Sequence, residues 1–470
     1  MNRCQKVVPF PMKISAILDK AARSIALLLI KFYQVVLSPL KICLFGTLCQ
    51  CRFRLTCSQY AKQMYATHNF FKATLLTIGR LMKCQPFYRP QPSSDEEKSE
   101  TLPKLYFSNT KADKNLKYLL GCTVESDIAV IKQATELTIL AHALEINRLK
   151  NESKATEVVA LEGLKTGKKP KLGELVAKFV KHVTGKKKVA VHRNFPFWLG
   201  FDLSVKGFKL IIDPHDTLAE RSIKSEHEVK CIGEVLSVIN GCFKEVRKIL
   251  HQSKIGKRGI LEFQGSELTS GFIRGEIEKY CYSNGCLAEN TIVACGCQSA
   301  DPHCQGYGPI RANEFIVIDL FPFHRTSGYY GDITRTFLRG IPTEAQINMY
   351  ESVKAAQEMA HRDLKHGVTC SGLMGNTLKF LESKNYKTDK AASIPYGMFH
   401  SLGHGFGLEI HEEPFISDNE TVLKSGNVIT LEPGLYYPET GGVRIEDNFL
   451  IADEGCEKLS EQISYDWVVN

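Results

Sequence analysis

The chain has 470 residues, of which 43% are hydrophobic and 24% are charged. This composition is typical of soluble globular proteins and argues against bulk disorder, while the length suggests more than one domain. Charge is unevenly divided: residues 1–92 carry fourteen Lys and Arg but only Asp19 as an acidic residue, whereas the remainder carries 46 basic and 50 acidic residues. Two parts of different character are therefore joined in one chain.

Sixteen cysteines are many for one chain, but their scatter does not resemble a disulfide framework, and a chain of this size does not need one. We expect reduced thiols in a cytoplasmic protein, and the basic N-terminus has no cleavable signal. A zinc site is the alternative near the N-terminus. The cysteines there lack CxxC spacing, which favours buried thiols; they are Cys43, Cys49, Cys51, Cys57 and Cys84.

The first predicted element is an amphipathic helix over residues 18–38. Its polar side chains fall within an arc of about 100°, and apolar side chains cover the rest. A transmembrane helix needs about 20 apolar residues in a row, but Arg23 and Lys31 leave seven residues between them, and Pro39 ends the helix. We expect the helix to lie on an anionic membrane surface, with a core helix of a small domain as the alternative. No nucleic acid is expected, because the aromatic side chains are not interleaved with basic ones.

Three stretches of sequence, LLLIKFYQVVLSPL, CRFRLTCSQYA and RLMKCQPF, lie within residues 18–88. Together they resemble the YidD-type membrane-protein insertion efficiency factors. The resemblance implies a peripheral protein on the cytoplasmic side of the inner membrane that acts beside the membrane-insertion machinery. Leu55 stands where the family usually has Pro, Gln85 where it has His, and the family's Gly-Gly-Tyr-Asp-Pro ending is absent. We assign residues 1–92 to this module.

A Pro-, Ser- and charge-rich stretch, RPQPSSDEEKSE, predicts a linker, which we place at residues 93–102. Residues 103–222 then alternate apolar runs with amphipathic stretches, which predicts an α/β domain. The predicted strands are KLYFSN, DIAVIK, ELTILAH, KKVAVHR and FKLIID, and the predicted helices are ALEINRLKNE, KATEVVALEGL and KLGELVAKFVKHV. This alternation resembles the N-terminal domain of creatinase and the proline-specific peptidases. ERSIKSEHEV, residues 220–229, is interpreted as the hinge into a last domain, residues 223–470.

Short motifs in the last domain supply candidate metal ligands. FIVIDL predicts a strand carrying Asp319, and GYYGDITRTF places Asp332 at the start of a second strand. Adjacent strands would bring both carboxylates to one end of a sheet. HSLGHGFGLEIHE then supplies His404 among glycines that permit close approach, VITLEPGLY supplies Glu432, and GGVRIEDNFLI supplies Glu446. A single Asp or His in such a context is usually structural, but five in this order predict one site.

Four carboxylates and one imidazole form a hard donor set, which suits Mn²⁺, Co²⁺ or Fe²⁺ better than a thiolate-bound structural zinc. Without metal, the packed carboxylates would repel one another and their pKa values would rise. A pair of divalent ions removes that cost and can activate water and polarise a carbonyl. We therefore predict two divalent ions, with Mn²⁺ or Co²⁺ favoured and Zn²⁺ or Fe²⁺ also compatible.

The ordered set of five ligands makes residues 223 to about 465 similar to the pita-bread metallopeptidases: methionine aminopeptidase, prolidase and Xaa-Pro aminopeptidase. The resemblance implies that Asp319 binds one metal, that Asp332 and Glu446 bridge both, and that His404 and Glu432 complete the other site. It also implies a proton-shuttling role for Glu432. Further roles are implied for four residues: a substrate-facing His303, an oxyanion-stabilising His411, and His400 and Arg444 lining a proline-specific pocket.

The α/β domain in front of the last domain favours X–Pro cleavage over methionine removal, either as an aminopeptidase or as a prolidase. The predicted fold is thus a small helical basic module, a creatinase-type α/β domain and a pita-bread catalytic domain. An alternative function is a membrane-associated accessory factor for insertion of integral membrane proteins, with the peptidase part incidental. Proline-containing peptides are the expected substrates, and a homo-oligomer fits the family's habit.

Overall fold

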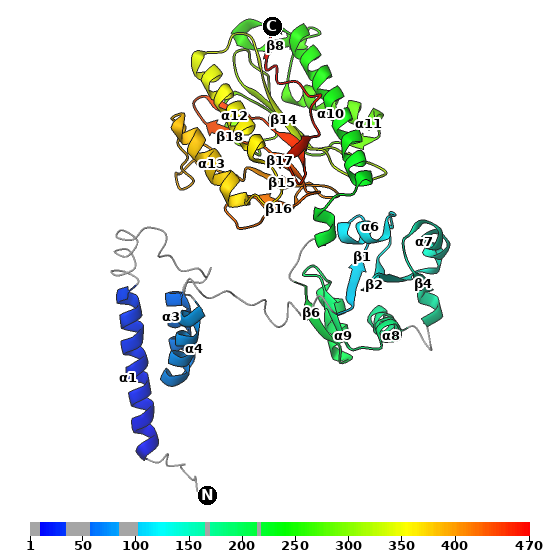
Figure 1. Ribbon diagram of the computed structural model, residues 1–470, viewed down its shortest axis with the longest axis vertical. Coiled ribbons are helices and arrows are strands. Elements are labelled where there is room, and N and C mark those ends of the chain that lie inside the picture. The colour runs from blue at the N-terminus through cyan, green and yellow to red at the C-terminus, as the bar shows by residue number, and fades with distance from the viewer. Residues whose placement is uncertain (1–9, 34–56, 84–101, 165–169, 214–217) are drawn as a thin grey trace, which may run out of the picture. The chain divides into compact units, whose positions relative to one another are not determined.

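The computed structural model describes residues 10–33, 57–83, 102–164, 170–213 and 218–470. Two compact units emerge, Met1–Thr101 and Leu102–Asn470 (Figure 1). Residues 93–101 of the predicted linker lie outside the described residues. Of the five N-terminal cysteines, Cys57 alone lies among the described residues, and it is a buried thiol.

Three helices make up the described part of the first unit: α1 (Phe10–Phe32), α3 (Cys57–Thr67) and α4 (Phe70–Lys83). The predicted helix therefore begins earlier than residue 18 and ends at Phe32, while residues 34–38 lie outside the described residues. Asp19 explains part of the packing, because its Oδ1 accepts a hydrogen bond of 2.7 Å from the Phe70 amide at the start of α4. Asp19, the single acidic residue among residues 1–92, thus lies on α1 and caps the N-terminus of α4.

Apolar side chains remain exposed on α1 and α4. On α1 they recur at helical spacing, at Ile25, Leu28, Leu29 and Phe32. On α4 they form a second row at Phe71, Leu75, Ile78 and Leu81. Such spacing places each row on one face of its helix. Among the described residues, no helix has both the length and the apolar character that crossing a membrane requires.

A six-stranded mixed sheet, in the order β4-β3-β2-β1-β5-β6, organises the first part of the second unit. Successive side chains of β1 point to opposite faces of the sheet, so the strand contributes to two cores. Leu105 and Phe107 pack with α8 and α9, whereas Tyr106 packs with α6 and α7. The elements are β1 (Lys104–Ser108), α6 (Lys114–Leu120), β2 (Ile128–Gln133), β3 (Glu136–Ala141), α7 (Ile146–Glu152), β4 (Glu157–Ala160), α8 (Leu172–Thr184), β5 (Lys188–Val191), α9 (Phe197–Val205) and β6 (Lys209–Ile212).

One predicted helix of this part is wrong. The stretch KATEVVALEGL contains β4, which pairs in parallel with β3 along Thr138–Ala141, and a short 3-10 turn. Val158 and Val159 are β-branched, and a strand edge was available beside β3, so sheet pairing prevails over the helical reading. The five predicted strands are all present, and helices α6 and α9 were not anticipated.

The rest of the unit places strands between pairs of helices (Figure 1). Helices α10 (Glu226–Gln252) and α11 (Ser270–Ser283) pack on one sheet through a core that includes Leu236 and Ile316. Helices α12 (Glu344–Asp363) and α13 (Cys370–Ser383) share a second core with Val353 and Ile429. Ser225 starts α10 with a capping box, in which the Ser225 and Glu228 side chains each bond the other residue's backbone amide. The predicted division at residues 222/223 precedes this cap and stays a prediction.

Two sheets carry most of the strands here, in the orders β11-β12-β14-β22 and β16-β15-β17-β20-β21, and a hairpin of β18 and β19 lies beside them. The main strands are β11 (Ile292–Cys295), β12 (Ile316–Leu320), β14 (Ile333–Arg339), β15 (Gly403–Gly405), β16 (Glu412–Ile416), β17 (Val428–Leu431), β18 (Gly434–Tyr437), β19 (Gly441–Arg444), β20 (Asp447–Ile451), β21 (Cys456–Lys458) and β22 (Val468–Val469). Short strands complete the set: β7 (Lys254–Ile255), β8 (Leu261–Phe263), β9 (Ser266–Glu267), β10 (Cys286–Leu287) and β13 (Phe323–His324).

Candidate metal centre

Two of the candidate carboxylates are brought together by one pair of antiparallel strands. Asp319 on β12 pairs with Thr334 on β14, and Asp332 precedes Thr334 by two residues. Alternate residues of an extended chain share a face, so both aspartates lie on the same side of the sheet. The Asp332 side chain is buried, and its backbone carbonyl accepts a hydrogen bond of 2.8 Å from Asn448 Nδ2.

The second sheet contributes the imidazole and a third carboxylate. His404 Nε2 lies 3.6 Å from Asp332 Oδ2 and 3.4 Å from Glu432 Oε1. On the other side of the ring, Nδ1 lies 3.2 Å from the Gly405 carbonyl. If Nδ1 donates to that carbonyl, the lone pair of Nε2 faces the carboxylates, which is the arrangement that a histidine ligand needs.

Glu446 lies between β19 and β20 and faces the same centre. Thr334 Oγ1 donates to Glu446 Oε2 at 2.8 Å, and Arg444 Nε donates to Thr334 Oγ1 at 3.1 Å. Asp332, His404 and Glu446 can each offer a ligand atom within 4.8 Å of the others. Two buried carboxylate oxygens, Asp319 Oδ1 and Glu446 Oε1, have no hydrogen-bond partner among the described residues.

Burial and mutual repulsion govern the protonation of this centre. Burial raises the pKa of Asp332 well above its usual range, with Glu446, Asp319 and Glu432 adding to the effect. Burial likewise raises the pKa of Glu446 well above normal and that of Glu432 to about 8. Burial lowers the pKa of His404 to about 3. Such a centre, with two unpaired oxygens, fits cations that would replace the missing hydrogen bonds and neutralise the carboxylates.

A hydrogen-bonded chain runs along one wall of the centre. Arg444 Nη2 donates to Asp319 Oδ2 at 2.7 Å, and Arg444 Nη1 donates to Tyr436 Oη at 2.9 Å. The Tyr436 hydroxyl lies 2.9 Å from His400 Nε2, and His400 Nδ1 lies 2.7 Å from the Ser401 carbonyl. This network indicates that Nδ1 of His400 is protonated and that Tyr436 donates to Nε2. Burial lowers the pKa of His400 to about 4.

Three buried residues of this site were missed by sequence reasoning. Thr334 joins Arg444 to Glu446, and Tyr436 joins Arg444 to His400. Gln357 on α12 donates to the carbonyls of Leu431 and Ile445, at 3.1 and 3.2 Å, directly before Glu432 and Glu446. Two faint signals were available. Thr334 follows Asp332 by two residues, and Gln357 is a polar residue among the apolar buried positions of α12.

The remaining predicted residues, His303 and His411, are more exposed than the others. The His411 ring lies 4.4 Å from the His404 ring, centroid to centroid, in an edge-to-face arrangement. Proximity to His303 contributes to lowering the pKa of His411, after burial, and it also lowers the pKa of His400. Both exposed histidines therefore lie near the same opening of the centre.

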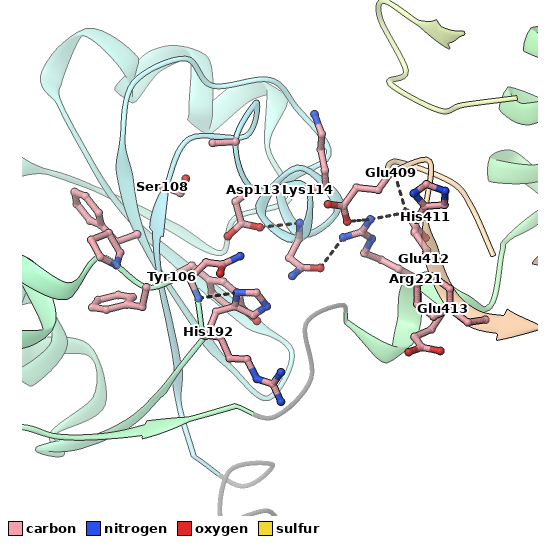
Figure 2. Close-up of a pocket in the computed structure, with 18 residues that line it drawn as sticks. Tyr106, Ser108, Asp113, Lys114, His192, Arg221, Glu409, His411, Glu412 and Glu413 are labelled. Carbon is pink, nitrogen blue, oxygen red and sulfur yellow. Dashed lines mark hydrogen bonds and ion pairs between the residues drawn. The ribbon is translucent and has the colours of Figure 1, made fainter. Parts of the chain in front are cut away.

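A cleft of about 660 Å³ continues from His411. Figure 2 shows its two walls: Tyr106, Ser108, Asp113, Lys114 and His192 come from the six-stranded sheet domain, and the facing side chains come from the hinge, the loop before β16 and the start of β16. Those facing residues are Arg221, Glu409, His411, Glu412 and Glu413. The cleft thus has many polar lining residues and includes His411, whose ring lies beside that of the candidate ligand His404.

Two family models match separate parts of the chain. Residues 231–453 match the model of "Metallopeptidase family M24", and residues 22–93 match YidD, "Putative membrane protein insertion efficiency factor". An Xaa-Pro dipeptidase of Pyrococcus horikoshii is 31% identical over 74% of this chain and 90% of its own length.

Solved structures show the same fold over the second unit. The prolidase from Pyrococcus horikoshii has a TM-score of 0.63 at 28% identity, covering 79% of this chain and 96% of its own. An X-Pro aminopeptidase from Thermotoga maritima has a TM-score of 0.65 at 26% identity, covering 80% and 99%. The predicted fold class and both predicted resemblances are confirmed.

Proposed function

The chain belongs to metallopeptidase family M24, and on that premise we propose that it cleaves X–Pro bonds with two divalent metal ions. As a metallopeptidase it uses divalent metal and acts on peptides. The observation that carries the finer proposal is the grouping of Asp332, His404 and Glu446, beside two unpaired carboxylate oxygens. Glu432 lies 3.4 Å from His404, and Asp319 is near enough to raise the pKa of Asp332. The named Xaa-Pro dipeptidase relative supports the choice of proline peptides as substrates.

Each proposed ligand has a place in this scheme. Asp319 would bind one ion, Asp332 and Glu446 would bridge the two, and His404 and Glu432 would complete the second site. Glu446 Oε2 is held by Thr334, which leaves Oε1 for a cation. The donors are hard, so we propose Mn²⁺ or Co²⁺, with Zn²⁺ and Fe²⁺ as weaker candidates.

When bound, the ions would lower the pKa of a water molecule and polarise the scissile carbonyl. The protein's own residues would do the rest. Glu432, whose pKa is raised to about 8 in the metal-free centre, would take up the proton of the attacking water and pass it to the leaving nitrogen. His411, at the opening of the centre, would donate to the developing oxyanion.

The wall made by His400, Tyr436 and Arg444 would contact the proline. Its rigidity supports that role, because Tyr436 and Arg444 are buried and each is hydrogen-bonded on both sides. A pre-formed wall orients a substrate at little entropic cost. His303, near the same opening, would face the residue before the scissile bond. We also propose that the protein forms homo-oligomers, as the family commonly does.

For the N-terminal unit we propose attachment to the cytoplasmic side of the inner membrane. The exposed apolar rows of α1 and α4, among basic side chains, suit insertion into an anionic lipid surface. The match to YidD favours a second function, assistance to membrane-protein insertion machinery. Because the two functions use different segments, one does not exclude the other.

The test is release of the N-terminal residue from Arg-Pro-Pro and from Gly-Pro by metal-stripped protein to which Mn²⁺ or Co²⁺ is restored. Asp332→Ala should reduce turnover at least about 100-fold, since loss of even a ligand's supporting partner costs 10–100-fold. Asp453→Ala, which removes an exposed carboxylate, is the matched control. Metal-loaded, folded protein that cleaves neither peptide would refute the proposed specificity.

A further inference from the structure

A buried group of charges lies next to His411, outside the metal centre. Arg221 and Lys224 come from the hinge before α10, and Glu412 begins β16. All three side chains are at most 2% exposed. We call Arg221, Lys224 and Glu412 the hinge triad.

Glu412 is fully engaged by this triad. Its Oε1 accepts hydrogen bonds from Arg221 Nη2 and from the Glu409 amide, the latter at 2.9 Å, and its Oε2 accepts one from Lys224 Nζ at 3.0 Å. Lys224 Nζ also donates to the Arg221 carbonyl at 2.5 Å. Lys224 and Arg221 together keep the pKa of Glu412 low against the effect of burial.

The triad reaches the preceding domain as well. Arg221 Nη1 donates to Asn115 Oδ1 on α6 at 2.8 Å, and Arg221 Nη2 also donates to Glu409 Oε2 at 2.7 Å. Figure 2 shows Arg221 between α6 and the loop that carries Glu409, His411 and Glu412. One guanidinium therefore connects the six-stranded sheet domain, the hinge and the loop beside the metal centre.

The burial of the hinge triad is weak evidence for a role in stability, because apolar residues in place of a buried ion pair are often as stable or more so. The contacts of the triad bear instead on the position of His411. The His411 side chain is itself exposed, and its ring lies against that of His404. In the chain His411 lies between Glu409 and Glu412, and the carboxylates of both glutamates are paired with Arg221.

We propose that the hinge triad consists of positioning residues that orient His411 over His404 and make this orientation depend on the docking of the preceding domain. The proposal rests on the proposed function, because it gives His411 a role in the reaction. Loss of the triad should misplace His411 without removing a metal ligand. A misplacement of about 1 Å can lower turnover about 100-fold.

The first experiment is Glu412→Gln in the full chain, in which the amide NH2 group would face the donors of either Arg221 or Lys224, and the negative charge that pairs both is lost. We expect kcat to fall about 10–100-fold on whichever proline peptide the unaltered protein cleaves, with KM within about twofold and metal content unchanged. The matched control is Glu420→Gln, which alters an exposed glutamate shortly after β16. Its kcat and KM should equal those of the unaltered protein.

A double-mutant cycle separates positioning from general structure. Glu412→Gln combined with His411→Ala should be no slower than His411→Ala alone, because the triad acts through His411. The proposal would be overturned if the fold losses in kcat of the two single variants multiplied in the double variant. Unaltered turnover in Glu412→Gln would overturn it as well. If Glu412→Gln does not fold, Arg221→Lys replaces it, since one ammonium cannot reach Asn115, Glu409 and Glu412 together. Arg221→Lys must then lower kcat several-fold.

Hydrogen–deuterium exchange provides a readout that does not need activity. Amides of residues 405–416 should exchange faster in Glu412→Gln or Arg221→Lys than in the unaltered protein, and Glu420→Gln should show no change. Unaltered exchange in folded triad variants would refute the positioning role. If the unaltered protein cleaves neither peptide, the proposed function fails, while this exchange measurement still decides the proposal on the triad.

Discussion

At the scale of single residues, the Thr334 hydroxyl group orients one candidate ligand of the metal centre, Glu446. Thr334 Oγ1 accepts from Arg444 and donates to Glu446, so it sets which oxygen of Glu446 is left for a cation. Arg335 holds the backbone of the same residue, since its Nη1 donates to the Glu446 backbone carbonyl at 2.5 Å. Its Nη2 is paired with Asp447 at 2.8 Å. The orientation of one ligand thus depends on neighbours that bind no metal.

Tyr436→Phe should weaken the substrate wall. Removal of the hydroxyl leaves Arg444 Nη1 and His400 Nε2 without their shared partner, and an unsatisfied buried group costs about 1–3 kcal/mol. We expect kcat/KM on proline peptides to fall about tenfold or more and the melting temperature to drop. Tyr437→Phe is the control, because the Tyr437 hydroxyl donates to the Lys387 carbonyl at 2.7 Å instead. Equal kinetics of the two variants would contradict the role given to Tyr436.

The pH dependence of stability should differ between metal-free and metal-loaded protein. Burial raises the pKa of Glu432 to about 8 in the folded metal-free state, against about 4.3 when unfolded. Between pH 6.5 and 8 the folded state therefore holds a proton that the unfolded state has lost, so stability falls as pH rises. His404, with a pKa of about 3 in the folded state, is deprotonated throughout this window when folded. The unfolded imidazole is about half protonated at pH 6.5, so its opposing contribution is confined to the lower edge of the window.

The expected slope is up to about 1.4 kcal/mol per pH unit for each such proton. Melting curves from pH 6.5 to 8, with chelator or with Mn²⁺, measure it. Metal-loaded protein should lack the slope, because ligand carboxylates bind the ion without a proton. Parallel curves with and without metal would show that the carboxylates do not hold excess protons.

At the scale of elements, β15 shows why the motif around His404 contains so many glycines. A Cβ on Gly403 would lie 2.0 Å from the Thr430 carbonyl oxygen, and one on Gly405 would lie 2.5 Å from the Glu413 carbonyl oxygen. Backbone from two neighbouring strands passes over these positions. The close approach that the sequence predicts for this motif is therefore present on both sides of His404.

Gly403→Ala should displace β15 and lower metal affinity. The neighbour is rigid backbone of β17, so the added methyl group must push the strand that carries His404. We expect a metal dissociation constant at least about tenfold higher and a lower melting temperature. Gly375→Ala on α13 is the control, since nothing lies within 4 Å of its Cβ and alanine favours helix by about 1 kcal/mol. Unaltered metal binding in Gly403→Ala would contradict this account of β15.

At the scale of the whole molecule, the chain joins two units with different surfaces. The first exposes apolar rows on α1 and α4, whereas the second has apolar cores around three sheets and exposes a shorter apolar row on α9, at Phe197, Phe201 and Val205. Burial of a single large apolar side chain contributes about 1.5–3 kcal/mol. Insertion of the eight exposed side chains of the first unit would therefore favour its proposed adsorption to lipid.

Removal of residues 1–101 should separate the two proposed activities. The full chain should sediment with anionic vesicles and be released by salt, since basic side chains add a screened attraction. Residues 102–470 should stay in the supernatant and keep peptidase turnover within about twofold. Phe71→Ser combined with Leu75→Ser should weaken sedimentation of the full chain, whereas Phe272→Ser, in the second unit, should not. Sedimentation of residues 102–470 would contradict the assignment of lipid binding to the first unit.

The sequence by itself determined the kinds of chemistry in this protein and their order along the chain. Strand periodicity around Asp319 and Asp332, the glycines around His404 and the apolar stripe of α1 are all recorded in windows of a few residues. The hardness of the ligand set follows from residue type alone. Both families and the fold class could therefore be stated in advance, because short-range pattern and donor chemistry suffice for them.

Tertiary structure alone decided which distant residues meet. Gln357 reaches carbonyls 74 and 88 residues away, and Arg221 reaches Glu412 across 191 residues. It also made residues 157–160 a strand, because an open edge beside β3 outweighed a helical pattern. Local sequence encodes periodicity and chemical type, but partners that lie far apart in the chain are chosen by packing, where a buried polar group must find whichever partner the fold brings to it.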